Sequence, residues 1–198
     1  MAVTEASPML ALPSADRPPA RNLLNIGALL GAIGGLMLAG GLVAAWFTVG
    51  HFTKPWPPDD INLSNYDGTM LSLTMLMSSV TVEWGIWAAR RSMRSQAVTG
   101  LAITAALGLA FLNLEWFLGR GLDLAVNSSA YAVLLYSMLA VTGVAVAAGV
   151  VVIGAVLTRV LGGQVMGTNI EVARAAGWFW QAVVLGWIVI YTTVWLLT

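Results

Sequence analysis

The chain has 198 residues, of which 59% are hydrophobic and 9% are charged, a composition outside the usual range of soluble domains. Nine Lys and Arg residues balance nine Asp and Glu residues, so the formal net charge is zero and no basic field favours nucleic acid as a partner. The absence of cysteine excludes disulfides, thiolate metal sites and cysteine nucleophiles, and the only histidine is His51.

Five long apolar stretches follow one another along the chain. Each is at least as long as the ~20 residues with which a helix crosses a hydrocarbon layer about 30 Å thick. Alternation at period two, which marks membrane barrel strands, is absent from these stretches. The sequence therefore predicts an all-α integral membrane protein, a five-transmembrane-helix bundle. We expect a disordered cytoplasmic tail at residues 1–21 and one membrane domain at 22–198, with spans at about 22–49, 67–89, 95–118, 128–157 and 173–197.

Arginines are concentrated at the N-terminus and in every second connection between the predicted spans. Because cytoplasmic loops carry an excess of Lys and Arg, this pattern places the N-terminus in the cytoplasm and the C-terminus outside. The setting that fits is a bacterial plasma membrane. The arginines that carry this prediction are Arg17, Arg21, Arg90, Arg91, Arg94, Arg159 and Arg174.

Glycines in the first predicted span form a surface of small side chains. Such a surface lets a second helix approach closely, which matters in lipid because dispersion and close packing drive helix association there. We favour packing inside the bundle over a dimer interface, since a five-helix chain offers many internal partners. The glycines concerned are Gly27, Gly31, Gly34, Gly35, Gly40 and Gly41, and Gly143, Gly149 and Gly154 of the fourth span are interpreted in the same way.

Two carboxylates lie within the predicted spans. Glu83 is about two turns from Arg90 at the end of the second span, and Glu115 is near the outer end of the third. An unpaired charge at such a depth costs ~2 to 3 kcal/mol or more, so each group should be paired, protonated or turned toward protein. For Glu83 we favour a carboxyl that joins two helices over a proton-linked or lipid-headgroup-linked group, and for Glu115 we expect a pair with Arg120.

Tryptophans lie near the ends of the predicted spans. Trp46, Trp116 and Trp195 are at outer ends, where amphipathic rings favour the level of the lipid headgroups. The sequence contains no pair of spanning histidines, no HExxH, no nucleophile elbow and no phosphate loop. We therefore expect no catalytic, cofactor-binding or metal-binding residue in this chain, and interpret it as a subunit.

Four short segments, taken in order, resemble a known family. They are 56–58 (Trp-Pro-Pro), 78–84 (Ser-Ser-Val-Thr-Val-Glu-Trp), 107–111 (Leu-Gly-Leu-Ala-Phe) and 178–181 (Trp-Phe-Trp-Gln), the last followed by Trp187, Tyr191 and Trp195. With the short arginine turn between the second and third spans, the set is similar to subunit III of the haem-copper cytochrome c oxidases, in a divergent five-helix form. The resemblance covers the chain from the first span onward.

The resemblance implies a non-catalytic accessory subunit of a respiratory complex. Such a subunit packs on subunit I beside the other oxidase subunits, holds phospholipid between its helices, and supports assembly or proton uptake during oxygen reduction. Haem and copper are then expected in the partner subunits. The candidate intramembrane polar or lipid-contact residues are Glu83, Trp84, Glu115, Arg90, Arg91, Arg94, Trp180 and Gln181.

The sequence also departs from the family pattern. The carboxylate typical of the first span falls at about Gly35, and the histidine-containing segments of the last two spans read Val-Thr-Gly-Val-Ala at 141–145 and Trp-Gln-Ala-Val-Val at 180–184. The glutamate expected in the third span is Leu118, and Glu115 takes the place of the usual glutamine. These losses favour a scaffold or lipid-holding role over a proton antenna.

Two alternatives remain open. One is a small membrane transporter or channel in which Glu83 lines a path, although such proteins show internal repeats or broken helices that these spans lack. The other is a subunit III-like component of a nitric oxide reductase complex. We favour the oxidase subunit.

Overall fold

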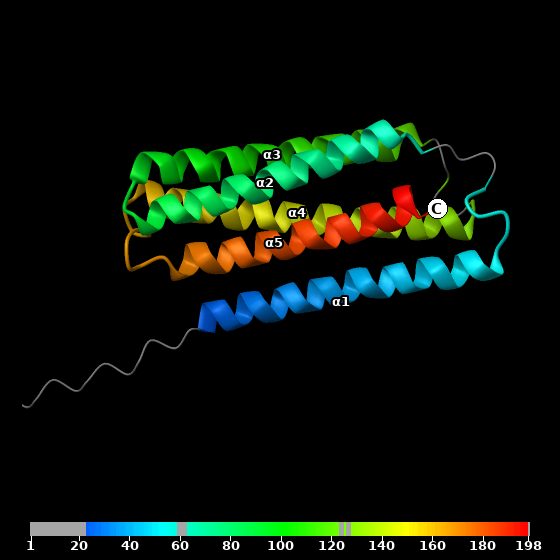
Figure 1. Ribbon diagram of the computed structural model, residues 1–198, viewed down its shortest axis with the longest axis horizontal. Coiled ribbons are helices and arrows are strands. Elements are labelled where there is room, and N and C mark those ends of the chain that lie inside the picture. The colour runs from blue at the N-terminus through cyan, green and yellow to red at the C-terminus, as the bar shows by residue number, and fades with distance from the viewer. Residues whose placement is uncertain (1–22, 59–62, 123–124, 126–127, 198) are drawn as a thin grey trace, which may run out of the picture.

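The computed structural model describes residues 23–58, 63–122, 125 and 128–197, so the tail predicted for residues 1–21 lies outside the described residues. The described residues form a bundle of helices that run lengthwise beside one another and are connected at its two ends (Figure 1). The helices are α1 (Leu23–Phe52), α2 (Asn65–Arg90), α3 (Arg94–Gly121), α4 (Ala130–Leu161) and α5 (Glu171–Tyr191), the last extended by a π-helical turn, Thr192–Leu196.

The five helices occupy the five predicted segments, with ends that differ by about a turn or less. Two of the helices begin at a side-chain cap: Ser64 before α2 accepts a hydrogen bond from the Asp67 backbone N–H, and Ser129 before α4 accepts one from that of Ala132. After α4 the chain turns through Gly163, whose φ of 71° lies in the left-handed region that glycine adopts without a Cβ clash. The turn between α2 and α3, the loop between α4 and α5 and the start of α1 lie at one end of the bundle (Figure 1).

Glycine lets α2 and α3 approach very closely. A Cβ at Gly100 would lie 2.8 Å from the Cα and backbone N of Gly85, and one at Gly85 would lie 3.1 Å from Leu101. Next to this crossing, the hydroxyls of Thr81 on α2 and Thr104 on α3 are 2.8 Å apart. Close packing of small residues with a hydrogen bond beside it is a typical means of joining helices in lipid.

Trp180 of α5 is one of the largest buried side chains of the core. Its ring is fully buried. A Cβ at Gly108 of α3 would lie 2.7 Å from the ring, and one at Gly149 of α4 would also lie 2.7 Å from it. The prediction that Gly149 serves packing is therefore confirmed, and these two glycines give the indole its space. Gly143 also faces a neighbour, the Glu115 carboxyl, whereas Gly154 has open space around it.

The glycine surface of α1 does not pack inside the described bundle, so our interpretation of it was wrong. A Cβ at any of these glycines would meet nothing within 4 Å. The buried residues of α1 are instead Ala32, Ala39 and Trp46, which recur every seven residues. Because α1 makes its helix contacts through this separate stripe, the glycines face open space and hold no neighbouring helix close. These glycines are Gly27, Gly31, Gly34, Gly35, Gly40 and Gly41.

The expectation of five clearly apolar spans also needs correction. By length and composition, four helical segments of the described chain could cross a membrane: Asn25–Phe52, Arg94–Gly121, Ala130–Leu161 and Glu171–Leu196. The helix α2 is not among them. It is long, but Asn65, Asp67, Glu83 and a series of serines and threonines lower its mean hydropathy. Hydropathy adds up side chains whatever they face, and many of the hydroxyls of α2 face other helices.

Candidate functional site

Polar side chains of α2 form a hydrogen-bonded seam with α5. The indole N–H of Trp187 donates to Ser72 Oγ at 3.1 Å, and that of Trp180 donates to Ser78 Oγ at 3.0 Å. Near the start of α2, Trp195 donates to the backbone oxygen of Ser64 at 3.2 Å. The residue numbers rise on one helix as they fall on the other, as the antiparallel course of α2 and α5 requires. The seam places the polar atoms of α2 inside protein, where they need partners.

The other end of the seam brings together two of the predicted site residues, Glu83 and Gln181. The Gln181 Nε2 atom donates to Glu83 Oε1 at 3.3 Å and to the backbone oxygen of Ser79 at 3.3 Å, while Ser79 Oγ donates to Gln181 Oε1 at 2.7 Å. Glu83 therefore joins α2 to α5 through an uncharged amide. Its side chain is exposed at the edge of the seam.

The remaining candidates near Glu83 lie on the outside. Trp84 is exposed, and Arg90 and Arg94 are exposed at the end of α2 and the start of α3. The Arg91 guanidinium lies over the ring of Trp87, 4.2 Å from its centroid. Trp180, in contrast, is in the core. The structure thus collects Glu83, Trp180 and Gln181 along one seam and leaves the arginines at the bundle end.

The predicted pairing of Glu115 with Arg120 is wrong. The Arg120 guanidinium lies over the ring of Trp116, 4.7 Å from its centroid. Glu115 is buried against α4, and its Oε1 atom has no hydrogen-bond partner among the described residues. The reason is helical geometry: residues five apart point in different directions, whereas Trp116 and Arg120, four apart, share one face.

Two of the three tryptophans expected at the headgroup level are core residues. Trp46 is fully buried, with ring centroids 4.9 Å from that of Trp56 and 4.8 Å from that of Tyr131, and Trp195 is also buried. Trp116 alone of the three is well exposed. Aromatic residues near helix ends can either meet lipid or close the end of the bundle, and position in the sequence does not separate these two uses.

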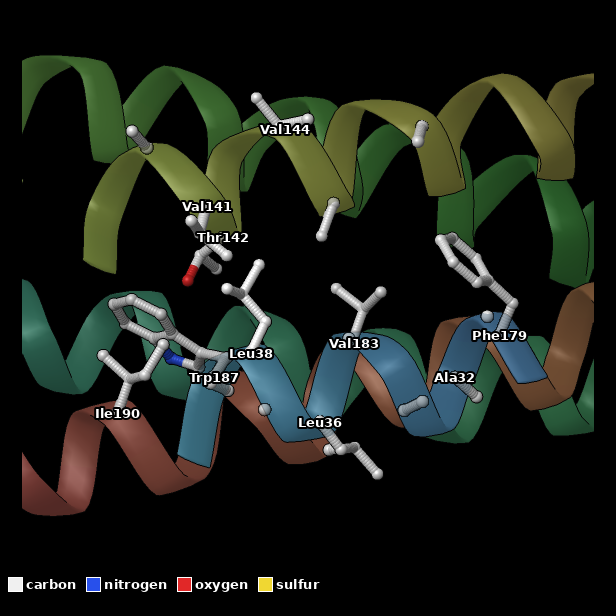
Figure 2. A pocket seen from close by; sticks show the side chains of 18 residues that line it. Ala32, Leu36, Leu38, Val141, Thr142, Val144, Phe179, Val183, Trp187 and Ile190 are labelled. Atoms are coloured by element: carbon white, nitrogen blue, oxygen red, sulfur yellow. The ribbon is translucent and has the colours of Figure 1, made fainter. Parts of the chain in front are cut away.

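An apolar groove of about 410 Å³ lies between α1, α4 and α5. Figure 2 shows Leu38 of α1 and Val183 of α5 in the space that faces α4. The only side-chain oxygen and nitrogen among its sticks belong to Thr142 and Trp187. Both have partners, because Thr142 Oγ1 donates to the Met138 backbone oxygen at 2.9 Å and Trp187 donates to Ser72. The groove therefore offers hydrocarbon walls without an unsatisfied polar group from Thr142 or Trp187.

Metal ligands do not gather in the described part of the chain. No group of three or more His, Asp or Glu side chains there could hold a metal ion. His51 is exposed in the last turn of α1, with its ring edge-on to that of Phe52. The polar residues of the seam join α2 to α5 by hydrogen bonds.

Sequence reasoning missed the serines of the seam. The acceptors Ser72 and Ser78 are six residues apart on α2, and the donors Trp187 and Trp180 are seven apart on α5. This similar spacing of hydroxyls and indoles was the available signal. It gains meaning only once the two helices are known to be antiparallel neighbours.

Comparisons with known proteins identify one family. A family model described as cytochrome c oxidase subunit III matches residues 15–198. The chain is 25% identical over 185 residues to a probable cytochrome c oxidase subunit 3 of Mycobacterium tuberculosis (strain ATCC 25618 / H37Rv), with 91% of this chain and 90% of that protein covered. It is also 25% identical over 174 residues to cytochrome c oxidase subunit 3 of Thermostichus vulcanus, with 87% of each chain covered. The match spans almost the entire length, and the chain belongs to the cytochrome c oxidase subunit III family.

Proposed function

We propose that this chain is a non-catalytic accessory subunit of a haem-copper oxidase, packed on subunit I and contributing to lipid retention and assembly. The observation that carries the proposal is the family match over residues 15–198. The other oxidase subunits are then its partners, and haem and copper are expected in them. The closed hydrogen-bonded seam supports a structural role over a transport path, since its hydroxyls and its amide are engaged with each other.

We propose that all five helices cross the membrane. The outward side chains in the middle of α2 are Leu73, Leu76, Met77 and Val80, which suit contact with lipid. Its serines face inward instead, so low mean hydropathy is compatible with a span. With the arginine-bearing connections on the cytoplasmic side, the N-terminus is inside and the C-terminus outside. The membrane is then the bacterial plasma membrane.

The groove between α1, α4 and α5 supports the lipid-holding part of the proposal. Its walls are the small and branched apolar side chains that an acyl chain contacts, and it opens on the outside of the bundle. A hydrocarbon chain needs no hydrogen-bond partner, and Thr142 and Trp187 already have theirs. We therefore assign this groove to the acyl chain of a phospholipid.

Purification tests the function directly. A tagged copy of the chain, isolated from its own membranes in mild detergent, is expected to bring with it a subunit that shows haem bands in a reduced-minus-oxidised spectrum. The same chain expressed alone should contain neither haem nor copper by absorption and metal analysis. Haem or metal retained by the chain alone would defeat the proposal, and a co-purified haem complex that reduces nitric oxide and lacks copper would indicate the reductase alternative.

Glu83→Gln is expected to leave assembly and turnover of the oxidase unchanged across pH. Glutamine keeps the shape of the side chain and an oxygen that accepts from Gln181 Nε2, so the join between α2 and α5 survives. The measurement is oxygen consumption by the purified complex between neutral and alkaline pH.

A suitable control is Glu171→Gln, which removes a carboxylate from the first turn of α5, at the same end of the bundle but outside the seam. A fall in turnover confined to alkaline pH in the assembled Glu83→Gln complex, without a similar fall in the control, would assign Glu83 to proton delivery. At high pH protons are scarce, so a proton-delivery group limits turnover there first.

A further inference from the structure

A second groove, of about 800 Å³, runs between α3 and α4 and includes the buried carboxyl of Glu115 in its wall. On α3 its lining extends from Leu109 to Arg120, roughly 16 Å along the helix axis at 1.5 Å per residue. On α4 it extends from Tyr136 to Val144. The groove therefore runs lengthwise from the outer end of the bundle toward its middle.

Glu115 lacks a partner in this wall. Its side chain is 8% exposed, and its buried Oε1 atom has no hydrogen bond among the described residues. The carboxyl lies against Gly143 of α4, where a Cβ would be 2.8 Å from Oε2. The carboxyl is also part of the groove lining, so a group that enters the groove and hydrogen-bonds to it does so where little water competes.

The chemistry changes in order along the groove. At the outer end, Arg120 lies over the Trp116 ring, and the Tyr136 hydroxyl donates to the Gly119 backbone oxygen at 3.2 Å. The Glu115 carboxyl comes next. The Asn113 amide lines the groove near the same level, and further in the lining is apolar, with both Leu109 and Val144 largely exposed. The sequence of groups from outside to inside is thus a cation, a hydrogen-bonding group and hydrocarbon.

A glycerophospholipid carries the complementary groups in the same order: a phosphate, a glycerol ester and an acyl chain. We propose that the groove between α3 and α4 binds one such lipid, with its phosphate at Arg120, an ester carbonyl accepting a hydrogen bond from the Glu115 carboxyl group, and the upper acyl chain along Leu109 and Val144. An arginine stacked on an aromatic ring keeps its in-plane N–H groups free for a phosphate. This groove adjoins the one in Figure 2, with which it shares Ala140 and Val144 of α4, and extends on the other side toward α3. It deepens the lipid-holding part of the proposed function.

Photolabelling of the full-length chain, purified alone and placed in phosphatidylcholine nanodiscs, tests the site. The probe is phosphatidylglycerol with a diazirine on one acyl chain. We expect labelled peptides from both groove walls, and a fall of roughly fivefold to tenfold in that label for Leu109→Trp, which fills the inner groove. Leu114→Trp is the matched control, because Leu114 is also an exposed leucine of α3 but is not part of the groove lining. Equal labelling of both variants would overturn the site.

Two further variants test the polar contacts. Glu115→Gln keeps an N–H donor and should retain the label, whereas Glu115→Leu should lose most of it. Arg120→Gln should lower labelling by phosphatidylglycerol to that of a diacylglycerol probe with the same diazirine chain. Unchanged labelling of Glu115→Leu and Arg120→Gln would overturn the proposal. The hydrogen-bond partner of the Glu115 carboxyl would then be a partner subunit or water. Because the chain is tested alone, failure of this labelling is distinct from failure to co-purify with the oxidase.

Discussion

Trp180→Ala is expected to destabilise the bundle severely. The indole is fully buried where α3, α4 and α5 meet, and its N–H donates to Ser78 of α2. Truncation leaves a cavity between Gly108 and Gly149 and removes one hydrogen bond to the Ser78 hydroxyl, which keeps its own bond to the Met75 backbone oxygen. Loss of a buried tryptophan typically costs about 3 to 5 kcal/mol. Unfolding in mixed micelles of increasing SDS fraction would measure the loss.

The control is two residues away. Trp178 is on the same helix but is 50% exposed, so Trp178→Ala should change the free energy of unfolding by less than about 1 kcal/mol. Trp180→Phe should have an intermediate effect, because it keeps one aromatic ring in this space but loses both the hydrogen bond to Ser78 and part of the contact with Gly108 and Gly149. Similar losses for Trp178→Ala and Trp180→Ala would contradict the packing of α5 against α3 and α4 through Trp180.

Hydropathy predicted the helices because a membrane span is a long apolar stretch of sequence. The predicted spans coincide with α1 to α5 to within about a turn at their ends. The mean hydropathy of α2 alone, however, does not identify it as a span. Ser72 and Ser78 lower the mean hydropathy of α2, yet each accepts a hydrogen bond from a tryptophan of α5. A window average contains no information about which neighbour a side chain meets.

Only part of the candidate site could be predicted, because sequence alone does not show which residues of neighbouring helices meet. Glu83 and Gln181 were both singled out, but the join between them depends on the antiparallel contact of α2 with α5. The pair of Glu115 and Arg120 was inferred from closeness in sequence, and the helix turns the two residues apart. Contacts within one helix follow from spacing, whereas contacts between helices require their mutual rotation.

The rotation of each helix about its axis also decides whether a glycine faces a neighbouring helix or open space. A glycine-to-alanine substitution is therefore expected to have opposite effects at Gly100 and Gly31. Gly100→Ala should destabilise the bundle, because the new Cβ would lie 2.8 Å from the backbone of Gly85 and backbone cannot move aside as a flexible side chain can. The helices α2 and α3 would separate and strain the contact between Thr81 and Thr104. Overpacking of this kind costs about 1 to 3 kcal/mol, and the same SDS titration would measure it.

Gly31→Ala is the matched comparison, and it should be neutral or stabilising. Nothing lies within 4 Å of the new Cβ on α1, so no neighbour has to move. Alanine is also favoured over glycine inside a helix by about 1 kcal/mol, because it loses less backbone freedom on folding. If both substitutions destabilised the isolated chain equally, the glycine surface of α1 would have to be packed inside the bundle, and α1 would be rotated away from the stripe of Ala32, Ala39 and Trp46 that buries it.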